Sequence, residues 1–136
     1  MPLTADLKAA DGAPRVMWRA SDAPWVVRNI TPEAEGYVTD GPFLWRTQDG
    51  TLLCLWASFS ARGYTQGLAV SDNGEIDGHF THLPPIDMAD AGHGMLFRDA
   101  AEQLWLTLHS PNVFPHERPH FIRMSDAGAA LRRAES

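Results

Sequence analysis

The sequence predicts an all-β fold: about two antiparallel four-stranded blades of a β-propeller, together with one orphan strand. The first observation is that 11 Gly and 10 Pro residues interrupt the 136-residue chain every few positions, which favours short strands and turns over long helices. The second is an internal repeat, because the stretch that starts at Asp40 matches the stretch that starts at Gly92. Its period of about fifty residues is the size of one four-stranded propeller blade.

The repeat depends on hydrophobic character more than on identity. With an offset of 52 positions, identical residues coincide at Leu44 and Leu96, Arg46 and Arg98, Leu52 and Leu104, and Ser58 and Ser110. Apolar residues also coincide, at Phe43 and Met95, Trp45 and Phe97, and Trp56 and Leu108. The two stretches therefore have the pattern of successive blades.

The elements are expected in the following order. Residues 15–20 form an isolated outer strand, residues 40–86 form one blade, and residues 92–134 form the next. The strands of the first blade are expected at residues 42–47, 52–58, 64–71 and 78–85. Those of the second are expected at residues 95–99, 103–109 and 119–124, with a weak or missing fourth strand. The tail, residues 125–133, fits either a turn with a strand stub or a short helix.

Two turns separate the strands of the first blade. Asp49-Gly50 is a hairpin signal between its first two strands. Ser71-Asp72-Asn73-Gly74 is a turn sequence after its third strand.

The predicted blades are too few to close a ring, because a propeller usually has four or more. Residues 1–136 are therefore expected to be a single, incomplete propeller domain. Two blades leave sheet faces that neighbouring blades normally cover. We expect either a homodimer or a partner chain that supplies the missing blades. A small self-contained β-sandwich of the same strands is the alternative.

Composition excludes several classes of function. The net charge of −6 argues against a nucleic-acid partner, which demands a basic face. The longest apolar runs, such as residues 52–57, are too short to cross a membrane, so no membrane partner is expected. No signal-peptide pattern is visible at the N-terminus, which favours a cytoplasmic location. The one cysteine, Cys54, has apolar neighbours and is expected in the core.

Six segments in a fixed order resemble the C-terminal part of glycoside hydrolase family 43. They are RASDAPWV, YVTDGPFLWRTQDGTLLCLWASFS, GYTQGLAVSDNGEIDGHFTH, AGHGMLFRD, LHSPN and ERPHF. Members of this family are five-bladed propeller enzymes that act on glycans containing arabinose and xylose. The resemblance implies a partial five-bladed propeller, an oligosaccharide substrate or ligand, and inverting hydrolysis of O-glycosidic bonds.

The resemblance places Asp40 at the position of the family's general acid. That acid typically stands in a Glu-Gly-Pro motif, which Asp40-Gly41-Pro42 matches with Asp in place of Glu. An inverting glycosidase also needs a carboxylate that activates water, roughly 6.5–9.5 Å from the acid. The resemblance implies that this base, and a second Asp that tunes the acid, precede residue 1. Burial and a neighbouring carboxylate would raise the pKa of Asp40, but the second condition is unmet here. The alternative role for Asp40 is a strand-start residue that accepts nearby N–H groups.

His93 is the candidate metal ligand. The family resemblance implies that a histidine at this position binds a calcium or other ion on the propeller axis, either directly or through water. The flanking Gly92 and Gly94 would let the backbone approach a central object closely. Because calcium prefers oxygen ligands, waters would have to supply most of them. The alternative is a turn histidine whose hydrogen bonds are satisfied within the protein.

Four further residues are candidates for contact with sugar. Arg118 could donate paired hydrogen bonds to a sugar, or form a surface ion pair with Glu117. Trp25, Phe43 and Phe59 could form an apolar floor for sugar rings, or lie in the core. His109 and Asn112, at a strand end and a turn, are additional candidates.

These observations leave two functions open. In the first, the chain is the C-terminal portion of a glycosidase that supplies the acid but lacks the base. Alone it is then expected to be inactive or very weak. In the second, the chain is a non-catalytic glycan-binding or assembly module that forms a propeller by oligomerisation.

Overall fold

The computed structural model describes residues 1–30, 35–127 and 130–134 and confirms the predicted all-β fold. The first sheet contains β3 (Asp40–Arg46), β4 (Leu52–Ser60), β5 (Gly63–Ser71) and β6 (Phe80–Leu83). The second contains β7 (Gly92–Arg98), β8 (Leu104–Ser110), β9 (Arg118–Ala127) and β10 (Ala130–Arg133). In each sheet, strands consecutive in sequence pair in antiparallel fashion, as in a propeller blade.

Three features differ from the expectation or resolve it. The outer strand expected at residues 15–20 is wrong: Arg15–Arg19 has no strand pairing, and a 3₁₀-helix, η1 (Ala20–Asp22), follows it. This segment is held by its side chains instead, because Trp18 packs against Trp56 and Phe80. The tail forms the strand β10, which supplies the weak fourth strand of the second blade, although residues 128–129 lie outside the described part. A two-stranded sheet of β1 (Asn29–Ile30) and β2 (Glu35–Gly36) was not expected.

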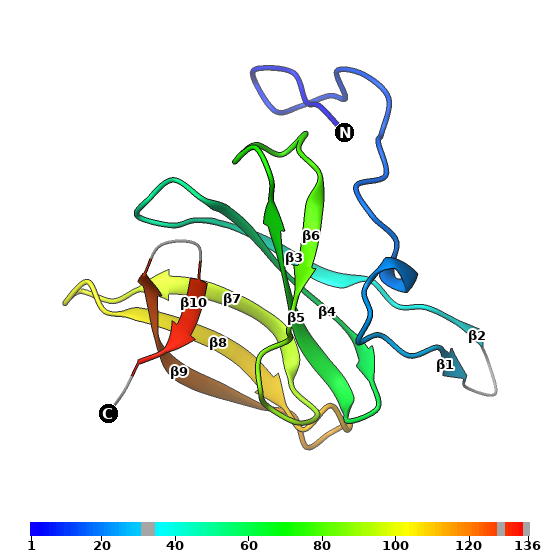
Figure 1. Cartoon of the computed structure of the whole chain (residues 1–136), viewed down its shortest axis with the longest axis vertical. Helices are drawn as coiled ribbons and strands as arrows, with labels where there is room; N and C mark the ends of the chain where they lie inside the picture. Colours follow the sequence, from blue (N-terminus) through cyan, green and yellow to red (C-terminus); the bar gives the residue numbers. More distant parts are fainter. Residues whose placement is uncertain (31–34, 128–129, 135–136) are drawn as a thin grey trace.

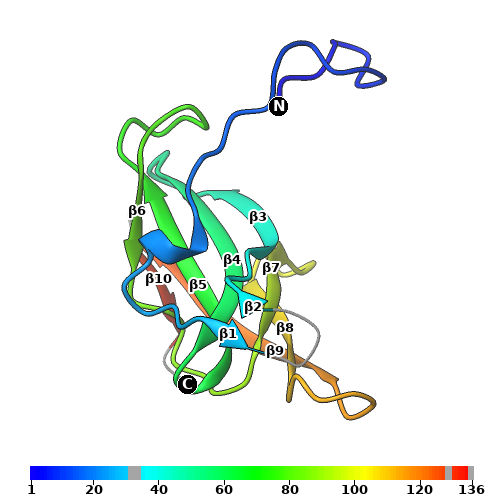
Figure 2. The same ribbon diagram turned by 90° about the vertical axis from the view of Figure 1, so that its right-hand side faces the viewer.

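The chain forms three layers, with the first blade in the middle. Alternate side chains of a strand point to opposite faces of its sheet, so the first blade can pack on both sides. One face of the first blade carries Leu53, Leu55 and Leu68, which pack against Leu96 and Leu106 of the second blade. The opposite face of the first blade is covered by the N-terminal segment. That contact buries a cluster of Ala20, Ala23, Leu52, Cys54, Trp56, Ala69 and Phe80, against which Trp18, Trp25 and Val26 pack. In Figures 1 and 2 the N-terminal segment, the β3–β6 sheet and the β7–β10 sheet lie in that order.

The repeat read from the sequence is reproduced in atomic detail at the ends of β3 and β7. Arg46 Nη1 donates to the carbonyl of Gly50 at 2.9 Å, and Arg98 Nη1 donates to the carbonyl of Glu102 at 3.0 Å. Each arginine therefore ties down the hairpin turn four residues further on. Within the described residues, no helix has the length and apolarity that crossing a membrane requires.

Candidate functional site

The two innermost strands begin with the same distortion, and this distortion positions the candidate site. The β3–β4 ladder shifts register between Asp40 and Phe43, and the β7–β8 ladder shifts between Gly92 and Met95. These are equivalent positions at the offset of 52. The second residue of each bulge has a left-handed backbone, with φ of 52° at Gly41 and 55° at His93. A bulge re-aims side chains and is over-represented beside active sites.

The bulges bring Asp40 and His93 together across the blade interface. His93 Nδ1 lies 3.2 Å from Asp40 Oδ2, and both side chains are about half exposed, at 54% and 46%. The imidazole lies over Gly41, where a Cβ would be 2.9 Å from the ring. Gly41 is therefore required twice, for its left-handed φ and for the space that His93 occupies. The structure thus joins the two main candidates predicted from the sequence.

Asp40 is surrounded by hydrogen-bond donors. Tyr64 donates its hydroxyl to Asp40 Oδ2 at 2.8 Å, and the N–H of Gly41 donates to Asp40 Oδ1 at 2.9 Å. Burial opposes ionisation of this carboxyl, but the hydrogen bond from Tyr64, the charge of His93 and the Gly41 N–H outweigh it. The net result lowers the pKa of Asp40 below its usual value. The raised pKa that an acid needs is absent in this chain, because donors rather than a second carboxylate surround the group.

Tyr64 is a site residue that the sequence analysis missed. Its side chain is buried, it stacks on His109 with ring centroids 5.5 Å apart, and Phe59 packs against it at 5.4 Å. Burial and the neighbouring Asp40 raise the pKa of the Tyr64 hydroxyl far above its usual value, so it remains a donor. An aromatic residue within a strand is typical of a core position, and nothing local in the sequence distinguishes Tyr64 from one.

Asp90, in the connection before β7, and His109, on β8, support this tyrosine. Asp90 Oδ1 accepts the backbone N–H of Tyr64 at 3.3 Å, and Asp90 Oδ2 accepts that of Asn112 at 2.9 Å. His109 Nε2 lies 2.9 Å from Asn112 Oδ1. His109 and Asn112, expected as further candidates, therefore support the site indirectly: His109 stacks on Tyr64, and Asn112 is within hydrogen-bond distance of His109. Because both oxygens of Asp90 accept backbone N–H groups, this carboxylate is occupied in a structural role.

Gly92 and Gly94 have a different role from the one expected. A Cβ at Gly92 would lie 2.6 Å from the ring of Tyr64, and one at Gly94 would lie 2.7 Å from Gln66 Oε1. The N–H of Gly94 also donates to that oxygen at 2.6 Å. These glycines thus allow β7 to approach β5 of the neighbouring blade, a role that the sequence analysis did not expect.

The four predicted sugar-contact residues separate into two groups. Arg118 lines a groove of about 440 Å³ together with His93, His109 and Glu117. Its guanidinium donates to the carbonyls of Pro115 and Glu117, at 3.2 and 2.7 Å. Among the described residues no carboxylate pairs with Arg118, so the ion pair with Glu117 is not formed.

The aromatic candidates lie in three different places. Phe59 packs on Tyr64, beside Asp40. Phe43 packs against the core between the two blades. Trp25 packs on Trp56, with ring centroids 5.0 Å apart, and against Gly67. For Phe43 and Trp25 the structure thus agrees with the core alternative that the sequence left open.

The residues present do not fit a calcium site by themselves. Calcium takes six to eight oxygen ligands, and His93 offers one imidazole that faces Asp40. Over the described ranges, no group of three or more His, Cys, Asp or Glu side chains is arranged to hold a metal ion. Asp40 Oδ2 is already shared by Tyr64 and His93.

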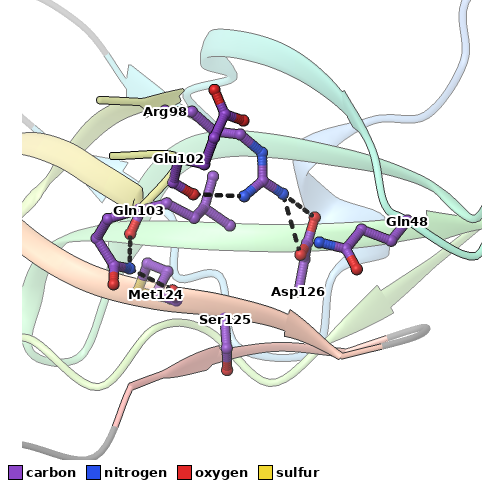
Figure 3. A pocket seen from close by; sticks show the side chains of 8 residues that line it. Gln48, Arg98, Glu102, Gln103, Met124, Ser125 and Asp126 are labelled. Atoms are coloured by element: carbon purple, nitrogen blue, oxygen red, sulfur yellow. Dashed lines mark hydrogen bonds and ion pairs between the residues drawn. The ribbon is translucent and has the colours of Figure 1, made fainter. Parts of the chain in front are cut away.

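A second pocket lies where β7 ends, at the opposite end of the strand from His93, and two of its charged residues, Arg98 and Asp126, form an ion pair (Figure 3). Asp126 is buried and accepts from Arg98 Nη2 at 3.3 and 3.1 Å. Asp126 also accepts from Trp45 Nε1, across the blade interface, at 3.2 Å. Arg98 lies over the Trp45 ring, 5.7 Å from its centroid. These contacts join the two blades, and we call the cluster of Trp45, Arg98 and Asp126 the clamp.

The comparisons with known proteins agree with the fold. No family model matches the chain, and no curated protein matches it. Among solved structures, the chain is similar to an endo-arabinase from Bacteroides thetaiotaomicron VPI-5482, with 36% sequence identity and a TM-score of 0.84. The similarity covers 90% of this chain and 44% of that enzyme, so the chain spans less than half of the enzyme's length. The two sheets therefore correspond in fold to part of that arabinase.

Proposed function

We propose that this chain carries the acid half of a glycoside hydrolase site that acts on arabinose-containing glycans, with the inverting mechanism of glycoside hydrolase family 43. The observation that carries the proposal is the pairing of Asp40 with His93 at equivalent bulges of the two innermost strands. The similarity to an endo-arabinase supports arabinan as the substrate class. Xylose-containing glycans are the second class that the family resemblance suggests.

In this proposal Asp40 protonates the glycosidic oxygen as the bond to the anomeric carbon breaks. A base outside this chain removes a proton from the water that attacks the opposite face of the sugar. Arg118 would orient the sugar from the groove that it shares with His93. Because Asp40 has a lowered pKa here, it is ionised near neutral pH and cannot donate a proton. A neighbouring carboxylate, brought by the missing blades, would raise that pKa.

The second candidate function is a glycan-binding module without catalysis. The lowered pKa of Asp40 favours it for the chain alone, because an ionised carboxylate accepts hydrogen bonds from sugar hydroxyls. Both functions predict binding of arabino-oligosaccharides near Asp40 and Arg118. They differ in what the missing blades add, since only the first gains hydrolysis.

Titration calorimetry with arabino-oligosaccharides, together with an assay of sugar release from arabinan, tests the proposal. We expect weak binding, and hydrolysis slower than that of a complete enzyme by at least about 10²–10⁴, the contribution of a general base alone, because ionised Asp40 cannot act as the acid either. Asp40→Asn should weaken the binding, whereas Asp87→Asn, at an exposed ion pair with Arg62, should not. Binding that is absent, or unchanged by Asp40→Asn, would remove Asp40 from the site.

A further inference from the structure

The buried side-chain nitrogen and oxygen atoms that lack a hydrogen-bond partner, among the described residues, all lie in one cluster of four rings. They are Nε1 of Trp18, Trp25 and Trp56, and both ring nitrogens of His82. The centroid of the Trp56 ring lies 5.9 Å from that of Trp18, 5.0 Å from that of Trp25 and 5.2 Å from that of His82. Trp18 and Trp25 belong to the N-terminal segment, whereas Trp56 lies on β4 and His82 on β6. This ring cluster is therefore the contact between that segment and the first blade.

We call residues 15–27 of the N-terminal segment the strap, and it is held mainly by its side chains. In the described part of the chain, two hydrogen bonds join the strap to the first blade, one at each end. Arg15 Nη2 donates to the carbonyl of Ile76 at 3.2 Å, and the N–H of Val27 donates to the carbonyl of Phe59 at 2.9 Å. Between these ends, the ring cluster and its apolar neighbours hold the strap in place. Proteins open locally at free energies below that of global unfolding, and a segment without strand pairing is suited to such opening.

His82 is the member of the ring cluster that can change its charge near neutral pH. Its ring lies nearly perpendicular to that of Trp18, with centroids 5.7 Å apart. A neutral imidazole has one N–H donor, whereas the protonated ring has two donors and carries a charge. Within the described ranges neither ring nitrogen of His82 has a hydrogen-bond partner. Protonation beneath the attached strap would therefore bury a charge and a second unpaired donor, which is unfavourable. Once the strap is open, water can hydrate both N–H groups.

The neighbouring charges do not reverse this effect. Burial of the imidazole lowers the pKa of His82 below its usual 6.5. The charge of Asp22, on η1, opposes that change, and the charge of His79, which precedes β6, adds to it. Asp22 is also engaged within the strap, because its Oδ2 accepts the N–H of Arg19 at 2.8 Å. The two indoles beside His82 are uncharged, and their attraction for a protonated ring acts in the same direction as Asp22. The net effect still disfavours protonation of His82 under the attached strap.

We propose that the strap is a pH-sensitive device, which detaches from the first blade when acidification protonates His82. In the opened strap His82 titrates as a free histidine, near pH 6.5. Attachment therefore keeps its full stability above about pH 6.5 and loses stability as the pH falls below it. The equilibrium constant for opening should rise by up to about tenfold between pH 7.5 and pH 5.5. The strap ends where Val27 bonds to Phe59, and Phe59 packs on Tyr64 beside Asp40, so its release would reach the candidate site. The proposal rests on the ring cluster and not on the proposed function.

The chain's one cysteine, Cys54, can report the opening, because it is buried under the strap together with Trp56. Its labelling by the thiol reagent dithiodipyridine is followed in the intact 136-residue chain between pH 7.5 and pH 5.5. Each rate is divided by that of the urea-unfolded chain at the same pH, which removes the titration of the thiol itself. We expect the normalised rate to rise by about three- to tenfold as the pH falls over this range.

Three variants assign the effect. His82→Phe keeps an aromatic ring in the cluster and removes the titration, so its normalised rate should not change with pH. His116→Phe, at an exposed histidine between β8 and β9, is the matched control and should retain the pH dependence. Trp18→Ala should raise the rate at pH 7.5 by at least about tenfold, because it removes one ring of the strap from the contact. Circular dichroism checks that the three variants are folded.

Hydrogen exchange of the β8 backbone amides distinguishes opening of the strap from unfolding of the whole chain. After correction for the intrinsic exchange rate, exchange in β8 should not follow the change in Cys54 labelling. Three results would overturn the proposal: a normalised labelling rate in the parent that does not change with pH, a pH dependence that His82→Phe retains, or exchange in β8 that accelerates in step with the labelling. The readouts are labelling and exchange, so a chain that neither binds nor hydrolyses arabinan would count against the proposed function alone.

Discussion

Removing one hydroxyl group should measure how strongly the protein holds Asp40 in its ionised form. Tyr64→Phe deletes the donor that lies 2.8 Å from Asp40 Oδ2 and leaves the packing of the ring on His109 intact. A hydrogen bond to a charged group contributes about 1.5–3 kcal/mol. Because the Asp40 side chain is 46% exposed, water replaces part of that bond, and we expect a loss of about 1 kcal/mol.

The direction of the pKa shift determines how the contribution of Asp40 to stability changes with pH. A carboxyl whose pKa is lower in the folded state stabilises the fold above its unfolded pKa, and loses that contribution as the pH falls through the folded pKa. The pKa of Asp40 is lowered from 3.8, and Tyr64 is the largest of the lowering causes. In Tyr64→Phe the pKa of Asp40 therefore rises towards its unfolded value. The difference in unfolding free energy between the two proteins should shrink as the pH falls below 3.8 and through the lowered pKa of Asp40.

Urea unfolding at pH 7 and pH 2.5 makes the measurement. With a slope of about 2 kcal/mol per molar urea, the variant's midpoint at pH 7 should be lower by about 0.5 M. Tyr37→Phe, at the chain's other tyrosine, which is exposed, is the control and should shift the midpoint little. A variant as stable as the parent at pH 7, or a difference that grows at low pH, would refute the reasoning about Asp40.

Three further predictions concern packing, the clamp and the metal. Gly94→Ala should destabilise the fold by about 1–3 kcal/mol in urea unfolding, because the added methyl group overpacks against Gln66. Gly36→Ala is the control and should be near neutral, because open space surrounds Gly36. Equal effects of the two substitutions would contradict the close approach of the blades. Asp126→Ala should lower the free energy of unfolding by about 2–4 kcal/mol, because it leaves Arg98 and Trp45 without their acceptor. A loss below about 0.5 kcal/mol, as for an exposed ion pair, would show that the clamp contributes little. Adding millimolar calcium should leave the melting temperature unchanged, and a clear rise in differential scanning fluorimetry would reveal a site that the described residues do not display.

The sequence was sufficient to predict the two blades because their strands repeat at a fixed offset. Leu44 with Leu96, and Arg46 with Arg98, align β3 with β7, and turn residues such as Asp49-Gly50 mark where strands end. The same offset relates Gly41 to His93, which correspond in the folded protein as the left-handed residues of two bulges. Periodic patterns therefore predicted most of what depends on local backbone geometry.

The remaining features depend on contacts between segments distant in sequence. Residues 15–19 have strand-like composition, but Trp18 fixes them through side-chain packing, which no local pattern reveals. Tyr64 meets Asp40 because β4 pairs with both β3 and β5 of the first blade, which brings residues 24 positions apart to the same end of the sheet. The direction of the Asp40 pKa shift likewise depends on donors from three separate strands. Secondary-structure propensities and residue spacing along the sequence cannot predict such contacts.

The central claim is that two blades carry the site without the environment that would make Asp40 an acid. The most direct measurement is a carbon-13 NMR titration of the Asp40 side-chain carboxyl in the intact 136-residue chain. A pKa below 3.8 is the result that the surrounding Tyr64, His93 and Gly41 donors predict. A pKa above about 5 would mean that this chain alone already holds Asp40 protonated as a catalytic acid requires, and would contradict the account.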